Sequence, residues 1–308
     1  MREPIKSFEQ LLEVAKKIGP KKVSVAVAQK KVVLQAIKEA EELGLIEGIL
    51  VGNQDEIIRI AKEFDWQVPT SKIIDEPDCT LSVRRAVELV RDKKADIIMK
   101  GKTTSADIYR AVLDREMGMR TGQLLSQVVV FRVPGINRLM ILSDDSVNIA
   151  PNLAQKAEIC RNTIEVAHAL GVKMPKLAVL STLEMVNHDI PSTVDAACLT
   201  VMGQRNQITG AVIDGPIALD ATIAKWVAEE KGFTSPTAGC TDIFICPTIE
   251  AANILYRSII YLAKGESGGV VMGAAAPILA LSRAEPVETK IHSICLGVLI
   301  AHAKFEGE

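Results

Sequence analysis

The sequence predicts an α/β protein in which parallel sheets, covered by helices, are divided between two domains. Short runs rich in Val and Ile alternate with longer segments of helical period, which is the pattern of strand–helix–strand units. Hydrophobic residues make up 48% of the chain but aromatic residues only 4%, so the core is aliphatic, as in helix-covered sheets. At 308 residues the chain is long for a single core and suits two.

The alternation is clearest in the first third of the chain. KKVSVAVA predicts a strand, and QKKVVLQAIKEAEEL after it has the spacing of a helix. A later strand, ADIIMKG, ends at Gly101. In this part of the chain we expect strands at 21–28, 46–52 and 95–101 and helices at 29–43, 55–64, 80–92 and 104–116. This succession is typical of a parallel sheet.

A different pattern follows Gly118. VVVFRVP (128–134) and NRLMILSD (137–144) succeed one another with no helix between them, which predicts an antiparallel pair. The alternation then resumes, and GESGGVVMG is interpreted as a glycine-rich turn. The later expected elements are helices 151–170, 191–202, 218–231, 249–263 and 284–305 and strands 176–181, 208–214 and 242–248.

The terminal helix bears on the domain organisation, because chain ends often dock back onto the first domain. We therefore expect a discontinuous first domain, 1–120 plus 273–308, and a second domain at 121–272.

Charge and composition argue against several classes of partner. The net charge of −2 gives no basic excess for binding nucleic acid, and the few aromatic residues do not suit a stacking surface for single strands. The longest uncharged stretch, at about 267–282, contains glycines and a proline and is too short to span a membrane as a helix. The polar N-terminus does not resemble a secretory signal, and the six scattered cysteines form no CxxC motif. We expect a cytoplasmic protein with reduced thiols.

Familiar catalytic motifs are incomplete or absent. KGKTTSAD (100–107) resembles the end of a P-loop, but the glycine required five residues before Gly101 is Asp96. The first strand–helix turn lacks the GxGxxG of dinucleotide-binding proteins, and GxSxG is absent. No histidines stand at metal-ligand spacing, so we expect no metal site; they are His168, His188, His292 and His302.

The end of the strand at Gly101 is a candidate anion site. Thr103, Thr104 and Ser105 begin the next helix, and anions bind where parallel strands end and helices begin. Plain capping of the helix explains the same residues. Arg110, two turns into that helix, reads by itself as a solvated surface charge.

Two further polar stretches have open interpretations. In LSDDSVN, Asp144 and Asp145 point to opposite faces of a strand, so one of them caps the turn, and Asn148 bonds either a ligand or its own backbone. In GAAAPILALSRA (273–284), Ser282 and Arg283 supply hydroxyl and guanidinium donors suited to a phosphate. A helix cap and an arginine paired with an acid would account for them equally well.

Several segments together resemble the phosphate acetyl/butyryl transferase family, and its butyryl branch more than its acetyl branch. They are KGKTTSADIYRAVLDREMGMRTG and the stretch from DGPIALD through PTIEAANILY to ALSRAEPVETKIHSI, and the similarity runs nearly from end to end. The resemblance implies a two-domain fold like that of isocitrate and isopropylmalate dehydrogenases, with the active site in the interdomain cleft. It also implies reversible conversion of acyl-CoA and phosphate to acyl phosphate and CoA. Coenzyme A is then a substrate, no cofactor is needed, and the chain forms a homodimer or higher homo-oligomer.

The resemblance also suggests site residues. The family's serine–arginine pair falls on Ser282 and Arg283, and a second family arginine falls on Arg110. The expected substrate-binding residues are Gly101, Lys102, Thr103, Thr104, Asp145, Asn148 and Gly273. One departure concerns the family aspartate seven residues after the serine, which is Thr289 here, with Glu285 and Glu288 nearby but not equivalent. Either another group deprotonates CoA, or a local positive field suffices.

The expected mechanism is direct transfer in a ternary complex, with butanoyl as the acyl group. An acetyl-specific transferase is the alternative within the family. A non-catalytic acyl-CoA-binding protein and a dehydrogenase of the same fold are the alternatives of another class, and the missing dinucleotide motif argues against the dehydrogenase.

Overall fold

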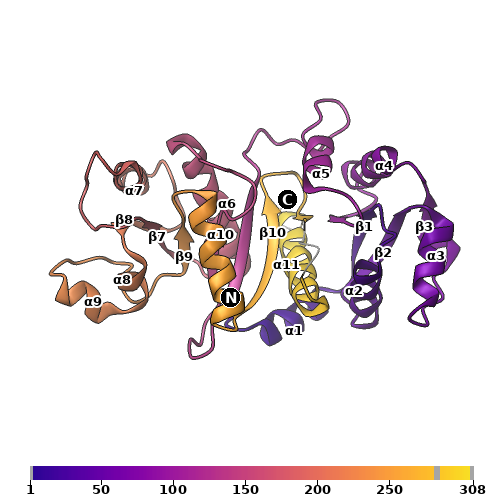
Figure 1. Ribbon diagram of the computed structural model, residues 1–308, viewed down its shortest axis with the longest axis horizontal. Helices are drawn as coiled ribbons and strands as arrows, with labels where there is room; N and C mark the ends of the chain where they lie inside the picture. Colours follow the sequence, from indigo (N-terminus) through magenta and orange to yellow (C-terminus); the bar gives the residue numbers. More distant parts are fainter. Residues whose placement is uncertain (1–2, 281–284, 306–308) are drawn as a thin grey trace. The chain divides into compact units, whose positions relative to one another are not determined.

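The computed structural model describes residues 3–280 and 285–305, and it divides into two compact units. The first unit comprises Phe8–Gln123 and the described residues from Gly268 onward. The second comprises the described residues before Phe8 and Leu124–Ser267. Figure 1 shows the elements of both, coloured along the chain.

The first unit contains a mostly parallel sheet whose strand order is β3-β2-β1-β4-β11-β10. Neighbouring strands pair in parallel except β10 and β11, which pair antiparallel. The strands are β1 (Lys21–Ala26), β2 (Ile46–Gly52), β3 (Ile73–Asp75), β4 (Ile97–Lys100), β10 (Glu266–Met272) and β11 (Ile278–Leu279). Since the carboxyl ends of parallel strands share one edge of a sheet, the turns after β1, β2 and β4 lie at the same edge.

Helices cover both faces of this sheet, as Figure 1 shows. One group, α1, α2 and α11, packs together, and α4 packs against α5. The helices are α1 (Phe8–Ile18), α2 (Lys31–Glu42), α3 (Gln54–Lys62), α4 (Cys79–Arg91), α5 (Ser105–Val112) and α11 (Val287–Phe305), with a 3-10 turn η1 (Thr70–Lys72). The sheet is therefore buried on both faces, which explains the continuous apolar runs of its central strands.

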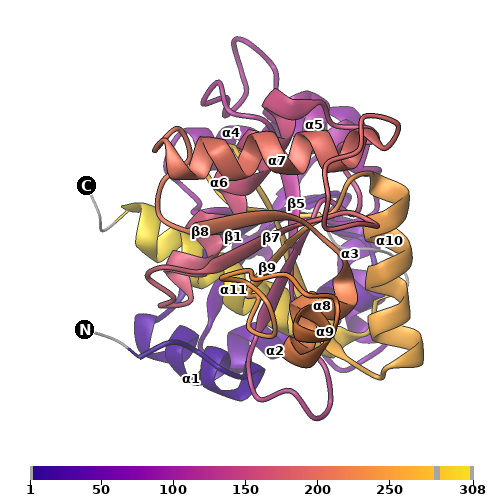
Figure 2. The same cartoon turned by 90° about the vertical axis from the view of Figure 1, so that its left-hand side faces the viewer.

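The second unit repeats this architecture with the strand order β5-β6-β9-β7-β8. As the sequence predicts, β5 and β6 pair antiparallel, and the other strands pair in parallel. Figure 2 shows α6 and α7 on one side of these strands and α8 and α9 on the other. The strands are β5 (Ser126–Arg132), β6 (Met140–Ser143), β7 (Lys176–Leu180), β8 (Val212–Ile217) and β9 (Ile243–Ile245). The helices are α6 (Leu153–Ala169), α7 (Pro191–Gln204), α8 (Leu219–Ile223), α9 (Lys225–Glu230) and α10 (Ile249–Arg257), which continues into the π-helical turn η2 (Ser258–Leu262).

Two local predictions were wrong, and some elements, helix α1 among them, were missed. GESGGVVMG is not a turn but the buried strand β10; a Cβ at Gly268 would lie 2.9 Å from the backbone of His292 on α11, so glycine lets the helix pack closely. The expected helix at 218–231 breaks at Ala224 into α8 and α9. Helix α1 was not predicted, although it buries Phe8 on α11, where the ring stacks on His292 with centroids 4.0 Å apart.

The division of the chain differs in detail from the boundaries expected at residues 120 and 273. The units divide after Gln123 and after Ser267. The segment before Phe8 belongs to the second unit, where the Ile5 N–H donates to the Leu170 carbonyl at 2.9 Å. Within the described ranges, no helix has both the length and the apolarity to cross a membrane.

Candidate active site

The chain turns tightly where β4 ends, at the predicted anion site. A Cβ at Gly101 would lie 2.2 Å from the carbonyl oxygen of Val27, so only glycine fits there. The Lys102 N–H donates to the same carbonyl at 2.7 Å, and Nζ of the buried Lys100 donates to Ser105 Oγ at 2.8 Å. The end of β4 is thereby fastened to the end of β1 and to the start of α5.

Val27, at the end of β1, has a strained backbone. Its φ of 54° lies in the left-handed region, which β-branched residues avoid. Two hydrogen bonds hold it there: its N–H donates to Ser82 Oγ at 3.0 Å, and its carbonyl accepts from Lys102. Strain of this kind often occurs beside functional sites, and here it lies next to the predicted one.

Thr104 caps α5, and Thr103 beside it binds the same aspartate. Thr104 Oγ1 accepts the Asp107 N–H at 3.1 Å and donates to Asp107 Oδ2 at 2.6 Å. Thr103 Oγ1 donates to the same carboxylate at 3.2 Å. The Thr104 hydroxyl, followed by Thr103 and Arg110, holds the pKa of Asp107 below its usual value despite some burial. Capping, one of the two interpretations of these residues, is therefore present.

Arg110 projects from α5 into solvent and pairs with Asp107, with Nη1 to Oδ1 at 3.1 Å. Its side chain is 76% exposed, and such surface pairs contribute at most about 1 kcal/mol. The guanidinium can therefore leave Asp107 for a competing anion at little cost in free energy.

Thr103, Asp107 and Arg110 border a pocket of about 390 Å³ between α4 and α5. The opposite wall is formed by α4, and the end by the turn that follows α5. These two walls consist of Cys79, Thr80, Val83, Arg84, Val87, Asp114, Glu116 and Met117, and Ala111 lines the pocket from α5 itself. Two arginines, Arg84 and Arg110, thus line one pocket beside the end of β4.

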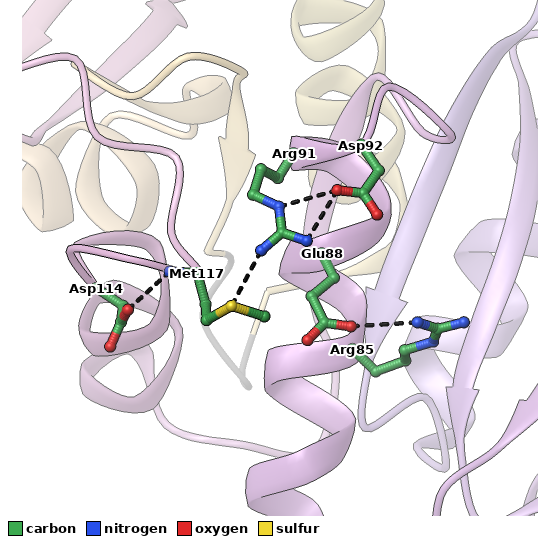
Figure 3. Close-up of polar contacts among 6 residues, drawn as sticks. All are labelled: Arg85, Glu88, Arg91, Asp92, Asp114 and Met117. Carbon is green, nitrogen blue, oxygen red and sulfur yellow. Dashed lines mark hydrogen bonds and ion pairs between the residues drawn. The ribbon is translucent and has the colours of Figure 1, made fainter.

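The turn after α5 is fastened to α4, as Figure 3 shows. Asp114 Oδ1 accepts the N–H groups of Glu116 and Met117 at 2.9 and 2.8 Å, and these bonds lower the pKa of Asp114, the Met117 bond most. Nη1 of Arg91, at the end of α4, donates to Met117 Sδ at 3.3 Å. The same guanidinium binds Asp92 at 2.9 Å. The pocket end therefore has a defined shape.

The predicted site residues of the second unit follow β6. Asp144 is buried, and its carboxylate accepts the N–H groups of Gln127, Ser146, Val147 and Asn148 at 3.0–3.2 Å. Burial raises the pKa of Asp144, and the hydrogen bonds from Ser146, Val147 and Asn148 oppose the rise. Asp144 is thus the aspartate that caps the turn.

Asn148 bonds its own protein, one of the two expected possibilities. Its Nδ2 donates to Asp144 Oδ2 at 2.6 Å and to the Leu125 carbonyl at 2.8 Å, so both amide hydrogens are used. Substrate binding by Asn148 stays a prediction and is restricted to its amide oxygen. Asp145 is buried, and its backbone carbonyl accepts Asn253 Nδ2 at 3.2 Å.

The C-terminal stretch is described only in part, since Ser282 and Arg283 lie outside the described residues. Gly273 ends β10 with a φ of 96°, a conformation that favours glycine, and its carbonyl accepts Thr121 Oγ1 at 2.6 Å. The structure thus collects Gly101, Lys102, Thr103, Thr104 and Arg110 around one turn of the first unit. Gly273 also belongs to this unit, and Asp145 and Asn148 belong to the second.

Sequence reasoning missed one residue of the pocket. Arg84 lines it from α4, and nothing in the local sequence separates Arg84 from its neighbour Arg85. Lys290, immediately before the apolar segment 291–301, is also buried, which the sequence analysis did not anticipate. Among the described residues, no group of three or more potential ligands is placed to hold a metal ion.

Comparison with known proteins agrees with the resemblance over nearly the whole chain. The family model described as "Phosphate acetyl/butaryl transferase" matches residues 78–298. A phosphate butyryltransferase of Clostridium acetobutylicum is 42% identical over 97% of this chain and all of its own length. That of Clostridium beijerinckii is 44% identical over 96% of this chain and 98% of its own, and a phosphate acetyltransferase of Thermotoga maritima is 40% identical over 96% and 99%.

Solved structures give the same result. A branched-chain phosphotransacylase from Enterococcus faecalis superposes with a TM-score of 0.80 at 28% identity, covering 92% of this chain and 99% of that one. A 4-hydroxythreonine-4-phosphate dehydrogenase from Klebsiella pneumoniae has a TM-score of 0.57 at 12% identity, covering 91% and 99%, and so shares the fold alone. With these matches in sequence and structure, the chain belongs to the phosphate acetyl/butaryl transferase family.

Proposed function

We propose that this chain converts butanoyl-CoA and phosphate reversibly to butanoyl phosphate and CoA. As a member of its family it is a phosphate acyltransferase. The observation that carries the choice of butanoyl is the end-to-end similarity to two relatives named phosphate butyryltransferases. The arginine-lined pocket at the end of β4 supports the binding of an anionic substrate.

The proposed chemistry needs no covalent intermediate on the protein. A phosphate oxygen attacks the thioester carbonyl, the C–S bond breaks, and CoA leaves as a thiolate that takes up a proton. Arg110 and Arg283 hold phosphoryl oxygens through charge-assisted hydrogen bonds. Ser282 donates to the oxyanion that develops on the carbonyl, an effect of about 3–4 kcal/mol for comparable donors. Arg110 can take this role because its pairing with Asp107 is solvent-exposed and weak.

The remaining expectations from the sequence, on fold type, site location and substrate contacts, are part of the same proposal. They are a fold of the isocitrate dehydrogenase type, a reaction in a cleft between the domains, and a cytoplasmic protein without metal or redox cofactor. Substrate contacts from Gly101, Lys102, Thr103, Thr104, Asp145, Asn148 and Gly273 are proposed likewise.

Self-association is also proposed, and the second unit offers a surface for it. Exposed apolar side chains lie on α9, α10 and η2: Trp226 is 68% exposed, Ile254 67% and Leu262 80%. A groove of about 200 Å³ lined by apolar residues, including Leu219 of α8 and Leu255 of α10, lies beside α8, α10 and η2. A second copy of the chain would cover this surface. Leu262→Glu should then lower the molar mass in light scattering, and an unchanged mass would exclude this surface as the interface.

The deciding experiment for the function measures thiol release from butanoyl-CoA and acetyl-CoA, with and without phosphate. Phosphate-dependent release that is faster with butanoyl-CoA is expected. Faster release from acetyl-CoA would favour the acetyltransferase. The 40% identical phosphate acetyltransferase of Thermotoga maritima supports that alternative. CoA binding without release would indicate a non-catalytic acyl-CoA-binding protein, and NAD-dependent absorbance changes would indicate a dehydrogenase.

A further inference from the structure

Lys176 and Cys240 form a lysine–cysteine contact in the second unit, and the proposed reaction has no role for it. Lys176 is the first residue of β7, and Cys240 lies in the loop that leads into β9. The Nζ atom of Lys176 donates to Cys240 Sγ at 2.9 Å. Over residues 3–280 and 285–305, this sulfur is the one hydrogen-bond acceptor of the Lys176 side chain, which pairs with no carboxylate there. An amine and a thiol thus lie directly against each other.

Backbone hydrogen bonds hold both residues of this contact in place. The Lys176 N–H donates to Asp242 Oδ2 at 2.9 Å, and the Asp242 N–H donates to the Lys176 carbonyl at 2.8 Å. The Cys240 N–H donates to the Thr237 carbonyl at 3.1 Å. Both side chains therefore start from fixed backbone positions, so little freedom is lost when a bond forms between them.

The sulfur atom of Cys240 is oriented and accessible. Its S–H donates to the Ala238 carbonyl at 3.3 Å, and its lone pairs are left to face Nζ of Lys176. Cys240 is half-buried, unlike the three buried cysteines of the chain. A small reagent from solvent can therefore reach this sulfur.

The contact lies away from the residues that we expect to bind substrate in this unit. Strands β6, β9 and β7 run parallel, and Lys176 and Cys240 lie where β7 and β9 begin. Asp145 and Asn148 follow the carboxyl end of β6. The lysine–cysteine contact is therefore at the opposite edge of the sheet from these two residues.

We propose that Lys176 and Cys240 form an oxidation-dependent cross-link site, in which a small hydroperoxide oxidises the thiol and the lysine amine then forms a sulfur–nitrogen bond. The inference goes beyond acyl transfer and does not depend on it, because neither residue takes part in the proposed reaction.

The cross-link forms in two steps. Hydrogen peroxide transfers one oxygen atom to the Cys240 thiol, its O–O bond breaks, water is released, and the sulfur is oxidised to a sulfenic acid. The Lys176 ammonium loses a proton to solvent, and the resulting amine attacks the sulfur. The S–N bond forms as the S–O bond breaks, and the departing hydroxide takes a proton from the attacking nitrogen and leaves as water. A dithiol reverses the cross-link, because its two thiols reduce the S–N bond and become a disulfide.

The first test looks for the cross-link in the wild-type full chain. The protein is treated with hydrogen peroxide, its remaining thiols are alkylated under denaturing conditions, and tryptic peptides are analysed by mass spectrometry. We expect two peptides joined between Lys176 and Cys240, with the mass of the pair less two hydrogen atoms. Trypsin should not cleave after the cross-linked Lys176, and dithiothreitol should restore the separate peptides.

Lys176→Arg is the matched variant, because a guanidinium keeps the charge and the donors but stays protonated and does not attack the sulfenic acid. Dimedone, which traps sulfenic acids, is present during the oxidation. It should label Cys240 about tenfold more in Lys176→Arg than in the wild type, because a positioned amine competes strongly with a reagent from solution. The exposed Cys79 is the internal reference and should be labelled equally in both proteins. Cys240→Ser should give no joined peptide.

Each other outcome would overturn part of the proposal. Oxidation of Cys79 with no change at Cys240 would overturn the site. Equal dimedone labelling of Cys240 in the wild type and in Lys176→Arg would overturn the role of the amine. A joined pair that retains an additional oxygen atom would overturn the displacement step. The joined peptide is sought in the wild type, so its presence or absence decides the proposal even where a variant does not fold.

Discussion

Two aspartates stand just beyond strand ends in the two units and are used in opposite ways. Asp107, after β4, lies near the surface, where two threonines and Arg110 surround its carboxylate. Asp144, after β6, is buried, and four backbone N–H groups and an amide surround its carboxylate. The pKa of Asp107 is lowered chiefly by the Thr104 hydroxyl, whereas burial raises that of Asp144.

This difference in burial and partners distinguishes a turn that can bind a substrate anion from a turn that only fixes the path of the chain. The partners of Asp107 are side chains that can exchange it for a substrate anion. Those of Asp144 are mainly backbone donors that would be left buried and unsatisfied without it, which is unfavourable by about 1–3 kcal/mol each. Identical residue types near strand ends thus differ in function because their burial differs.

The largest expected effect is on stability, from Asp144→Ala. This variant leaves several buried N–H groups without an acceptor, and we expect the free energy of unfolding to fall by about 3–5 kcal/mol. Urea denaturation followed by circular dichroism measures it. Asp107→Ala, the matched change at the exposed turn, should lower it by about 1 kcal/mol, the usual effect of a lost helix-capping contact. Equal losses of unfolding free energy in the two variants would contradict the difference between the buried and the exposed aspartate.

The next effect is on turnover, from Arg110→Ala. If Arg110 holds the phosphoryl group, kcat/KM for phosphate should fall about 100-fold in the thiol-release assay. Arg85→Ala is the control, because Arg85 is also an exposed helical arginine with an acid three residues away, Glu88 at 3.2 Å, but does not line the pocket. Similar activity in the two variants would remove Arg110 from the mechanism.

A smaller effect is expected on thiol labelling. Cys79 is exposed and lines the pocket with Arg110, whereas burial raises the pKa of Cys160, Cys246 and Cys295 to about 12. A thiol reagent at pH 8 should therefore label Cys79 and leave these three unreacted in the folded protein. Saturating phosphate with butanoyl-CoA should slow the labelling of Cys79. Labelling at an unchanged rate would mean that the substrates bind away from this pocket.

The smallest effect is on the titration of Asp107. Because its pKa is lowered in the folded state, the group contributes stability above its unfolded value of about 3.8, and this contribution is lost as the pH falls through the folded pKa. Carboxyl NMR should place the midpoint for Asp107 below 3.8. Thr104→Val, which removes the largest cause, should raise the midpoint, and a midpoint that does not move would assign the shift to another group.

The sequence by itself determined the features that depend on neighbours along the chain. The strand–helix alternation, the end of β4 at Gly101 and the antiparallel pair of β5 and β6 all follow from local period and turn chemistry. The capping by Thr104 follows from residue type at a helix start. The family was readable too, because it is carried by contiguous segments such as DGPIALD and PTIEAANILY.

Only the tertiary structure decided the features that depend on distant partners. β10 pairs with β11 as a strand, and its Gly268 lets α11 approach, which no local turn signal reveals. Asn148 forms hydrogen bonds with Asp144 and Leu125, and Met117 accepts one from Arg91. These partners come together only when the chain folds. Lys290 has the same charge as every exposed lysine in the sequence, and only its burial beside the Glu285 carbonyl distinguishes it. Burial is a property of packing between separate segments, and a linear pattern does not contain it.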